Sequence, residues 1–166
     1  QFQMRGVRYE MIMLLSLKAC MHVNAAAELV NSLPAPEEEE EEGAEAPAPG
    51  AGAESGHFDD TMREATEHYR RAAGVYRFLD ETQLPHIGTL EADRPPDVLT
   101  GYIQACVSLS LGLGQLCAVL SAANKGMAKG LVARLAADAA EKFGNAQFVL
   151  RELKSDIKDI YKQIPK

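Results

Sequence analysis

Residues 128–164 read AKGLVARLAADAAEKFGNAQFVLRELKSDIKDIYKQI, and this stretch decides the fold class. Its apolar side chains recur every three or four residues, which is the period of one face of an α-helix. No proline interrupts the pattern, and Gly144 is the expected position of a bend. The stretch therefore predicts a long amphipathic helix. Its apolar face consists of Leu131, Leu135, Ala139, Phe143, Ala146, Leu150, Leu153, Ile157, Ile160 and Ile164.

Another apolar helix is predicted just upstream, over about residues 97–123. The prolines at 95–96 favour a helix start there, and residues 124–126 (NKG) supply its end. Gly112 and Gly114 lie inside this helix, where each glycine costs about 1 kcal/mol relative to alanine. We therefore expect another helix to pack closely against the two glycines. The apolar face consists of Tyr102, Ala105, Cys106, Leu109, Leu113, Leu116, Cys117 and Leu120.

Two more helices are predicted in the first half of the chain. The first spans about residues 7–33, and its apolar face is Val7, Met11, Leu14, Leu15, Ala19, His22, Ala26 and Leu29. For the second, Thr61 and Glu64 have the spacing of a capping box at the start, with Phe58 as a hydrophobic staple. This helix runs to about residue 82, and its apolar face is Ala65, Tyr69, Ala72, Tyr76 and Leu79. No stretch alternates like a strand, so the predicted fold is all-α, with four helices in two antiparallel hairpins.

Residues 34–56 separate the first two predicted helices and have a different composition. They contain eight glutamates, no lysine or arginine, and many alanine, proline and glycine residues. Such a segment has too little apolar surface to bury, so we predict a disordered, solvated insertion. An acidic interaction tail is the less favoured alternative.

The charge outside this insertion is nearly balanced. The whole chain carries a formal net charge of -7, but the eight glutamates of residues 34–56 account for that excess. No broad basic surface is expected, and this argues against binding to nucleic acid.

Catalytic and metal-binding patterns are missing from the sequence. The four histidines, His22, His57, His68 and His86, fall on different predicted elements and lack HExxH or paired Cys/His spacing. Glu10 and Glu28 are most simply explained as solvated surface residues. The three cysteines, Cys20, Cys106 and Cys117, show no CxxC spacing and are predicted to be reduced, partly buried thiols. We therefore expect neither an enzyme nor a cofactor site.

Membrane and targeting signals are also missing. Polar residues such as Lys18 and Gln104 interrupt the most apolar stretches, so no membrane-spanning segment is predicted. The chain opens at Gln1 directly into a helical pattern. We expect a piece of a longer cytosolic protein.

Several motifs, in this order and at these intervals, resemble the central part of a BRO domain. They are Tyr9-Glu10, Tyr69–Leu79 (YRRAAGVYRFL), Arg94–Asp97 (RPPD), Gly112–Leu116 (GLGQL), Leu131–Ala136 (LVARLA) and Lys142–Ala146 (KFGNA). Of these, GLGQL falls where the family usually reads Ala-Gln-Ala-Gln-Glu. The segments AAGVYRFL and RPPD are most similar to green-lineage, Brox-like members. The resemblance covers residues 1–33 and 57–166 and leaves out the acidic insertion.

The resemblance implies a fold and a function. BRO domains are banana-shaped scaffolds of tetratricopeptide-like helix pairs, and they act as adaptors of the endosomal sorting (ESCRT) machinery. They bind an amphipathic C-terminal helix of charged multivesicular body proteins, which is helix-in-groove recognition. The resemblance also implies a cytoplasmic protein at endosomes, with peripheral membrane association through other parts of the protein.

By the same resemblance, the partner-binding positions are Ala118, Leu131 and Leu135. The two leucines keep the apolar character of the groove, whereas Ala118 stands where Alix carries an aromatic anchor. Losing such a ring could remove about 3 kcal/mol of contact. An ordinary core role for both leucines, and a structural helical subunit that has lost the groove, remain the alternatives.

Overall fold

The computed structural model describes residues 6–33, 52–88 and 94–162. Within them lie four long helices, α1 (Val7–Asn31), α2 (Gly52–Phe78), α3 (Thr100–Asn124) and α4 (Lys129–Lys162). A π-helical turn (Leu79–Gln83) and a 3-10 turn (Leu84–His86) follow α2, and a second 3-10 turn (Pro96–Val98) precedes α3. These ranges contain no strand, and the all-α prediction is confirmed.

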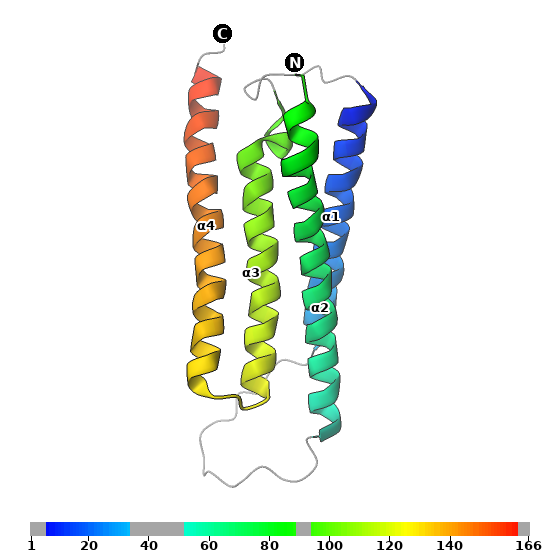
Figure 1. Cartoon of the computed structure of the whole chain (residues 1–166), viewed down its shortest axis with the longest axis vertical. Helices are drawn as coiled ribbons and strands as arrows, with labels where there is room; N and C mark the ends of the chain where they lie inside the picture. The colour runs from blue at the N-terminus through cyan, green and yellow to red at the C-terminus, as the bar shows by residue number, and fades with distance from the viewer. Residues whose placement is uncertain (1–5, 34–51, 89–93, 163–166) are drawn as a thin grey trace.

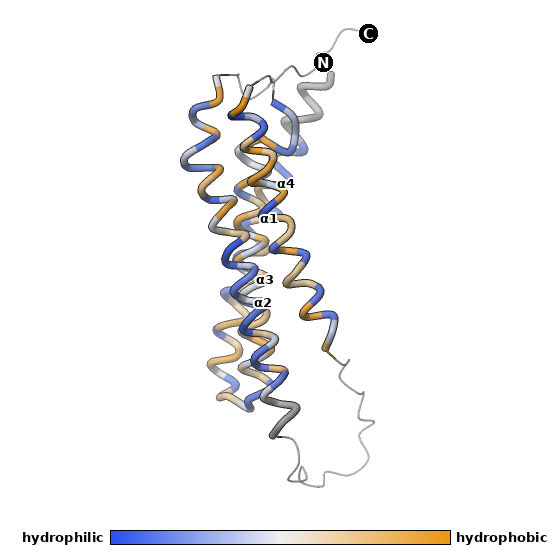
Figure 2. The backbone as a smooth tube through the Cα atoms, turned by 90° about the vertical axis from the view of Figure 1, so that its right-hand side faces the viewer, coloured by the Kyte–Doolittle hydropathy of each residue, from blue (hydrophilic) through white to orange (hydrophobic). Residues whose placement is uncertain are grey.

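The helices are arranged in chain order, each antiparallel to the one before it (Figure 1). The main contacts join α1 to α2, α2 to α3, and α3 to α4. In the view turned by 90°, α1 diverges from the other helices toward its C-terminal end (Figure 2). Since each long helix packs mainly on its chain neighbours, α3 keeps two open sides, one on each face of the array.

The turn between α3 and α4 has the backbone of a Schellman motif. Gly126 has a φ of +62°, its N–H donates to the carbonyl of Ala123, and the N–H of Met127 donates to the carbonyl of Ala122. Only glycine adopts this left-handed conformation without strain. The stop predicted at residues 124–126 is therefore confirmed.

The core consists of two apolar clusters along α2. One joins Ile12 and Ala19 of α1 to Tyr76 and Leu79, and the other joins Ala26 to Tyr69 and its neighbours. All five residues of the predicted α2 face are buried: Ala65, Tyr69, Ala72, Tyr76 and Leu79. Alanine positions let the neighbouring helices approach, and the tyrosine rings fill the space between them.

Close packing is confirmed at Gly112, whereas at Gly114 an added Cβ would make only ordinary contacts, with a different partner at each glycine. A Cβ on Gly112 would lie 2.9 Å from Cε1 of Phe143 in α4. A Cβ on Gly114 would lie 3.4 Å from Cβ of Tyr69 and 3.7 Å from the carbonyl oxygen of Thr66 in α2. The two glycines thus admit a helix on each side of α3.

The predicted apolar faces of α1 and α3 are partly wrong. Val7 and Leu14 were expected in the core, but they are 83% and 66% exposed, while Ile12 is fully buried. In α3, Leu109, Leu116 and Leu120 are 37–40% exposed, and smaller side chains take the helix contacts. Both helices are apolar on nearly every side, so periodicity does not select the packed face.

The start of α2 also differs from the prediction. The helix begins at Gly52, inside the predicted insertion of residues 34–56, whose remaining residues lie outside the described ranges. Thr61 lies within the helix, and its hydroxyl donates to the carbonyl of His57 at 2.9 Å. A threonine hydroxyl bonded four residues back satisfies its own donor inside a helix. The predicted capping box of Thr61 and Glu64 is therefore wrong.

By length and composition alone, α1 and α3 are apolar enough to cross a membrane. The sequence argument from interrupting polar residues did not anticipate this result. Core helices of soluble bundles meet the same criterion, and α3 packs between α2 and α4.

Candidate protein-binding surface

A cavity of about 530 Å³ lies between the N-terminal part of α2 and the C-terminal part of α3. Met62, Cys117 and Ala118 contribute its apolar wall. The polar lining residues are Asp59, Asp60, Arg63, Thr66, Ser121 and Lys125. An apolar wall with a polar rim is the composition of a site that accepts a side chain of a partner.

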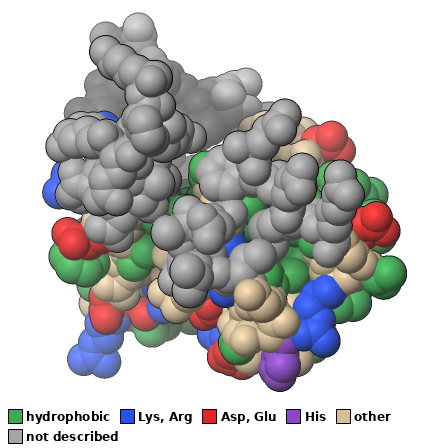
Figure 3. Space-filling model, turned by 90° about the horizontal axis from the view of Figure 1, so that it is seen from above, with side chains coloured by type: hydrophobic (Ala, Val, Ile, Leu, Met, Phe, Trp, Pro, Cys, Tyr) green, Lys and Arg blue, Asp and Glu red, His purple; other side chains and the backbone are tan. Residues whose placement is uncertain are grey.

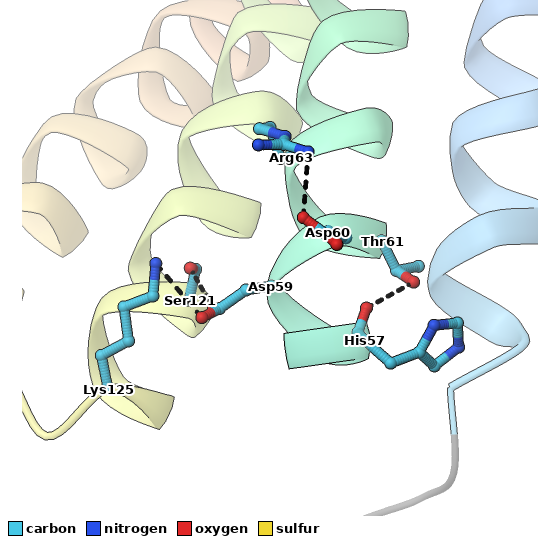
Figure 4. Close-up of polar contacts among 7 residues, drawn as sticks. All are labelled: His57, Asp59, Asp60, Thr61, Arg63, Ser121 and Lys125. Carbon is cyan, nitrogen blue, oxygen red and sulfur yellow. Dashed lines mark hydrogen bonds and ion pairs between the residues drawn. The ribbon is translucent and has the colours of Figure 1, made fainter. Parts of the chain in front are cut away.

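Asp59 ties the two helices together at this cavity (Figure 4). The hydroxyl of Ser121 donates to Oδ1 at 2.7 Å, and Nζ of Lys125 lies 3.2 Å from Oδ2. The Ser121 hydrogen bond is the main cause of the lowered pKa of the Asp59 carboxyl; desolvation opposes it, and Lys125 lowers the pKa further. The carboxylate is therefore ionised at neutral pH and fixes the end of α3 against α2.

A second ion pair stands at the cavity mouth. Nη2 of Arg63 lies 2.9 Å from Oδ1 of Asp60, and both side chains are largely exposed (Figure 4). Exposed pairs one turn apart on a helix contribute little to stability. Both side chains remain available to a partner.

Of the three predicted binding positions, one lines this cavity. Ala118 is half-buried in its wall. Leu131 is 40% exposed and Leu135 half-buried on α4, and neither leucine lines the cavity. The cavity brings Ala118 together with α2 residues that the sequence argument did not select, because contacts between separate helices leave no spacing signal.

Helical phase relates Leu131 to a position of α4 that contacts α3. Leu131 is 18 residues, or about five full turns, before Val149, so the two share a face of α4. Val149 contacts the position of Gly101 on α3. Phe143 lies on the other side of the same contact, against Gly112. Leu131 therefore lies about a third of a turn from Phe143, and Leu135 lies between these two directions around α4.

Two histidines on different predicted helices are in contact. Nδ1 of His22 in α1 lies 3.0 Å from Nδ1 of His68 in α2. Burial lowers the pKa of His22, and the charges of His68, Arg71 and Lys18 lower it further. One ring donates to the other, in a direction set by the tautomers, so the pair joins α1 to α2. Among the described residues, no group of three or more His, Cys, Asp or Glu is placed to hold a metal ion.

The three cysteines are free thiols with different surroundings. Cys20 is exposed, and its Sγ lies 3.3 Å from the hydroxyl of Tyr76. Cys106 is half-buried and Cys117 is buried, and burial raises the pKa of both thiols. A raised pKa lowers the thiolate fraction, so Cys106 and Cys117 are poor nucleophiles.

The described surface at the end that carries the 3-10 turns is mixed in character. Seen from above, hydrophobic, basic and acidic side chains are interspersed there, with no field of one sign (Figure 3). This view offers no extended basic patch of the kind that a phosphate backbone requires.

A comparison with protein families decides the identity of the fold. Residues 49–164 match the BRO1-like domain, and this match covers more than half of the chain. The chain belongs to the BRO1-like domain family. The match includes α2, α3 and α4, whereas α1 precedes it. Searches of curated proteins and of solved structures returned no match. BRO1-like domains are helical protein-interaction scaffolds of the ESCRT-associated kind, and they are not a known enzyme family.

Proposed function

We propose that this BRO1-like chain is an endosomal-sorting adaptor that binds an amphipathic helix of a charged multivesicular body protein. The proposed binding surface is a shallow trough formed by Ala118, Leu131 and Leu135. Two observations support this surface. Leu131 is 40% exposed, so it has apolar surface to bury on a partner. The chain also belongs to a family of protein-binding scaffolds.

The cavity beside Ala118 extends the proposal. Ala118 is small, and the adjoining space of about 530 Å³ can take a bulky side chain from the partner. Arg63 and Asp60 at its mouth can exchange their mutual ion pair for polar contacts with the bound helix. A partner side chain would thus supply the bulk that an aromatic residue would otherwise provide from the chain itself.

A titration of the full chain tests this function. A fluorescein-labelled C-terminal helix peptide of a charged multivesicular body protein is expected to bind with micromolar affinity. Leu135→Asp should weaken binding at least tenfold, because a charge replaces a half-buried apolar contact. Leu14→Asp, on the exposed side of α1, is the matched control and should leave the affinity unchanged.

A second function is a structural helical subunit that kept the fold and lost the groove. The small side chain of Ala118 favours it, since an alanine offers little contact area at a predicted anchor position. A folded protein that gives no detectable binding to the peptide would favour this role over the adaptor.

A further inference from the structure

An apolar stripe on α3 faces away from the trough, and its large side chains are partly exposed, while Leu113 at its inner edge packs against the core. Its large members are Tyr102, Leu109, Leu116 and Leu120, which are each 37–40% exposed. The spacings of seven, seven and four residues place them on one side of the helix, with the half-buried Leu113 between them. We call Tyr102, Leu109, Leu113, Leu116 and Leu120 the α3 stripe.

Contacts on either side of the α3 stripe fix its direction. On one side of the stripe around the helix, Cys106 packs against the core cluster that contains Tyr76 of α2. Gly112, next to it on the other side, packs against Phe143 of α4. The α3 stripe lies between these two edges, whereas Ala118 lies about half a turn from its central positions. The α3 stripe and the proposed trough therefore occupy opposite faces of the array.

Length and composition of the α3 stripe suit a helical partner. From Tyr102 to Leu120 the stripe extends about 27 Å, which is the length of a helix of about 18 residues. No charged residue occurs in α3 between Thr100 and Asn124.

The charges that border the α3 stripe on α4 are basic. Phe143 and Leu150 mark the edge of α4 that continues the stripe, and Lys129, Arg151 and Lys154 lie next to them around the helix, all exposed. Asp138, Glu141 and Glu152 are the acidic residues of α4 whose side chains the structure describes. Each lies about a third of a turn or more from Phe143 around the helix. The stripe thus has basic residues along its α4 border and one acidic residue, Asp97, near Tyr102 at its N-terminal end. The α4 border fits an apolar helix face flanked by acidic residues.

From this charge complementarity we propose that the α3 stripe is a second docking surface, which binds an acidic amphipathic helix of a protein partner. The surface is separate from the trough of Ala118, Leu131 and Leu135. Two partner helices could therefore bind opposite faces of one chain at the same time, so that the chain would hold two partners together.

The test uses two designed peptides and the full chain. The probe is an 18-residue labelled helix with leucines along one side and glutamates flanking them, and the control probe carries lysines in place of the glutamates. We expect the acidic peptide to bind with a Kd of tens of micromolar and the basic peptide at least tenfold more weakly. Leu116→Glu should lower the affinity for the acidic peptide at least tenfold. Leu14→Glu and Leu135→Asp should change that affinity less than twofold.

Circular dichroism checks that Leu116→Glu is folded. Lys154→Glu, at the border of the stripe, is a second and milder test, because it should also weaken binding of the acidic peptide. Equal binding of both peptides, or binding that survives Leu116→Glu, would overturn the proposal. Loss of binding in Leu135→Asp alone would assign the peptide to the trough. A wild-type dimer in light scattering that Leu116→Glu converts to a monomer would identify a second copy as the occupant. Leu116-dependent binding to lipid vesicles, with no peptide binding, would identify a membrane instead.

Discussion

Replacing the two glycines of α3 by alanine, one at a time, should change stability in opposite directions. At Gly112 a new Cβ would lie 2.9–3.2 Å from three ring atoms of Phe143, so the ring must shift. Overpacking of this kind costs about 1–3 kcal/mol, which exceeds the gain of about 1 kcal/mol in helix propensity. At Gly114 the nearest atom is 3.4 Å away, an ordinary contact, so the propensity gain should prevail.

The expected net changes are a loss of about 1 kcal/mol for Gly112→Ala and a gain of about 0.5–1 kcal/mol for Gly114→Ala. For a chain of this size, each corresponds to a change in melting temperature of about 2–4 °C. Thermal and urea melts followed by circular dichroism measure the change in unfolding free energy for both variants. Phe143→Leu should remove the penalty at Gly112, because the shorter side chain vacates the contact. Stabilisation by both alanines in the wild-type background would refute the packing at Phe143.

The remaining predictions address pH, the acidic segment and the trough. Because the pKa of His22 is lowered in the folded state, the unfolded chain binds its proton first, and stability should fall as pH drops below about 6.5. His22→Asn should flatten that pH dependence of the melting temperature; equal curves for wild type and His22→Asn would contradict the assignment. Deleting residues 37–45 should shift the melting temperature by no more than about 2–3 °C, since loop-closure entropy changes slowly with length; a larger fall would mean that the segment packs on the helices. Ala118→Phe should strengthen binding of the multivesicular-body peptide about ten- to fiftyfold if the new ring contacts it; unchanged affinity in a folded variant would place residue 118 outside the binding surface.

Sequence periodicity predicted the helices well where polar residues define a face. In α2, charged residues fill the outer side, and the five predicted core residues are all buried. In α1 and α3, apolar residues occur on almost every side, so the pattern alone could not separate Ile12 from Leu14 or Cys117 from Leu116. The packed side of α3 was chosen by small residues that allow close approach, and the two glycines were the informative signal.

Contacts between distant segments were beyond the reach of sequence spacing. His22 and His68 are 46 residues apart in the chain, and Asp59 and Ser121 are 62 apart, so no local pattern connects them. The start of α2 was mispredicted because Thr61 and Glu64 match a capping box by spacing, while the threonine hydroxyl bonds back to His57 within the helix. Leu131 and Leu135 were selected by family resemblance, and their role in binding remains a prediction.

The most direct test of the proposed adaptor function is to map the peptide on the chain by backbone NMR. Isotope-labelled protein is titrated with the C-terminal helix peptide of a charged multivesicular body protein, and amide shifts are followed to saturation. The adaptor proposal predicts the largest shifts at Ala118, Leu131 and Leu135, with smaller shifts around Arg63 at the cavity mouth. An unchanged spectrum of the folded protein at millimolar peptide, or shifts confined to the outer side of α1, would contradict it.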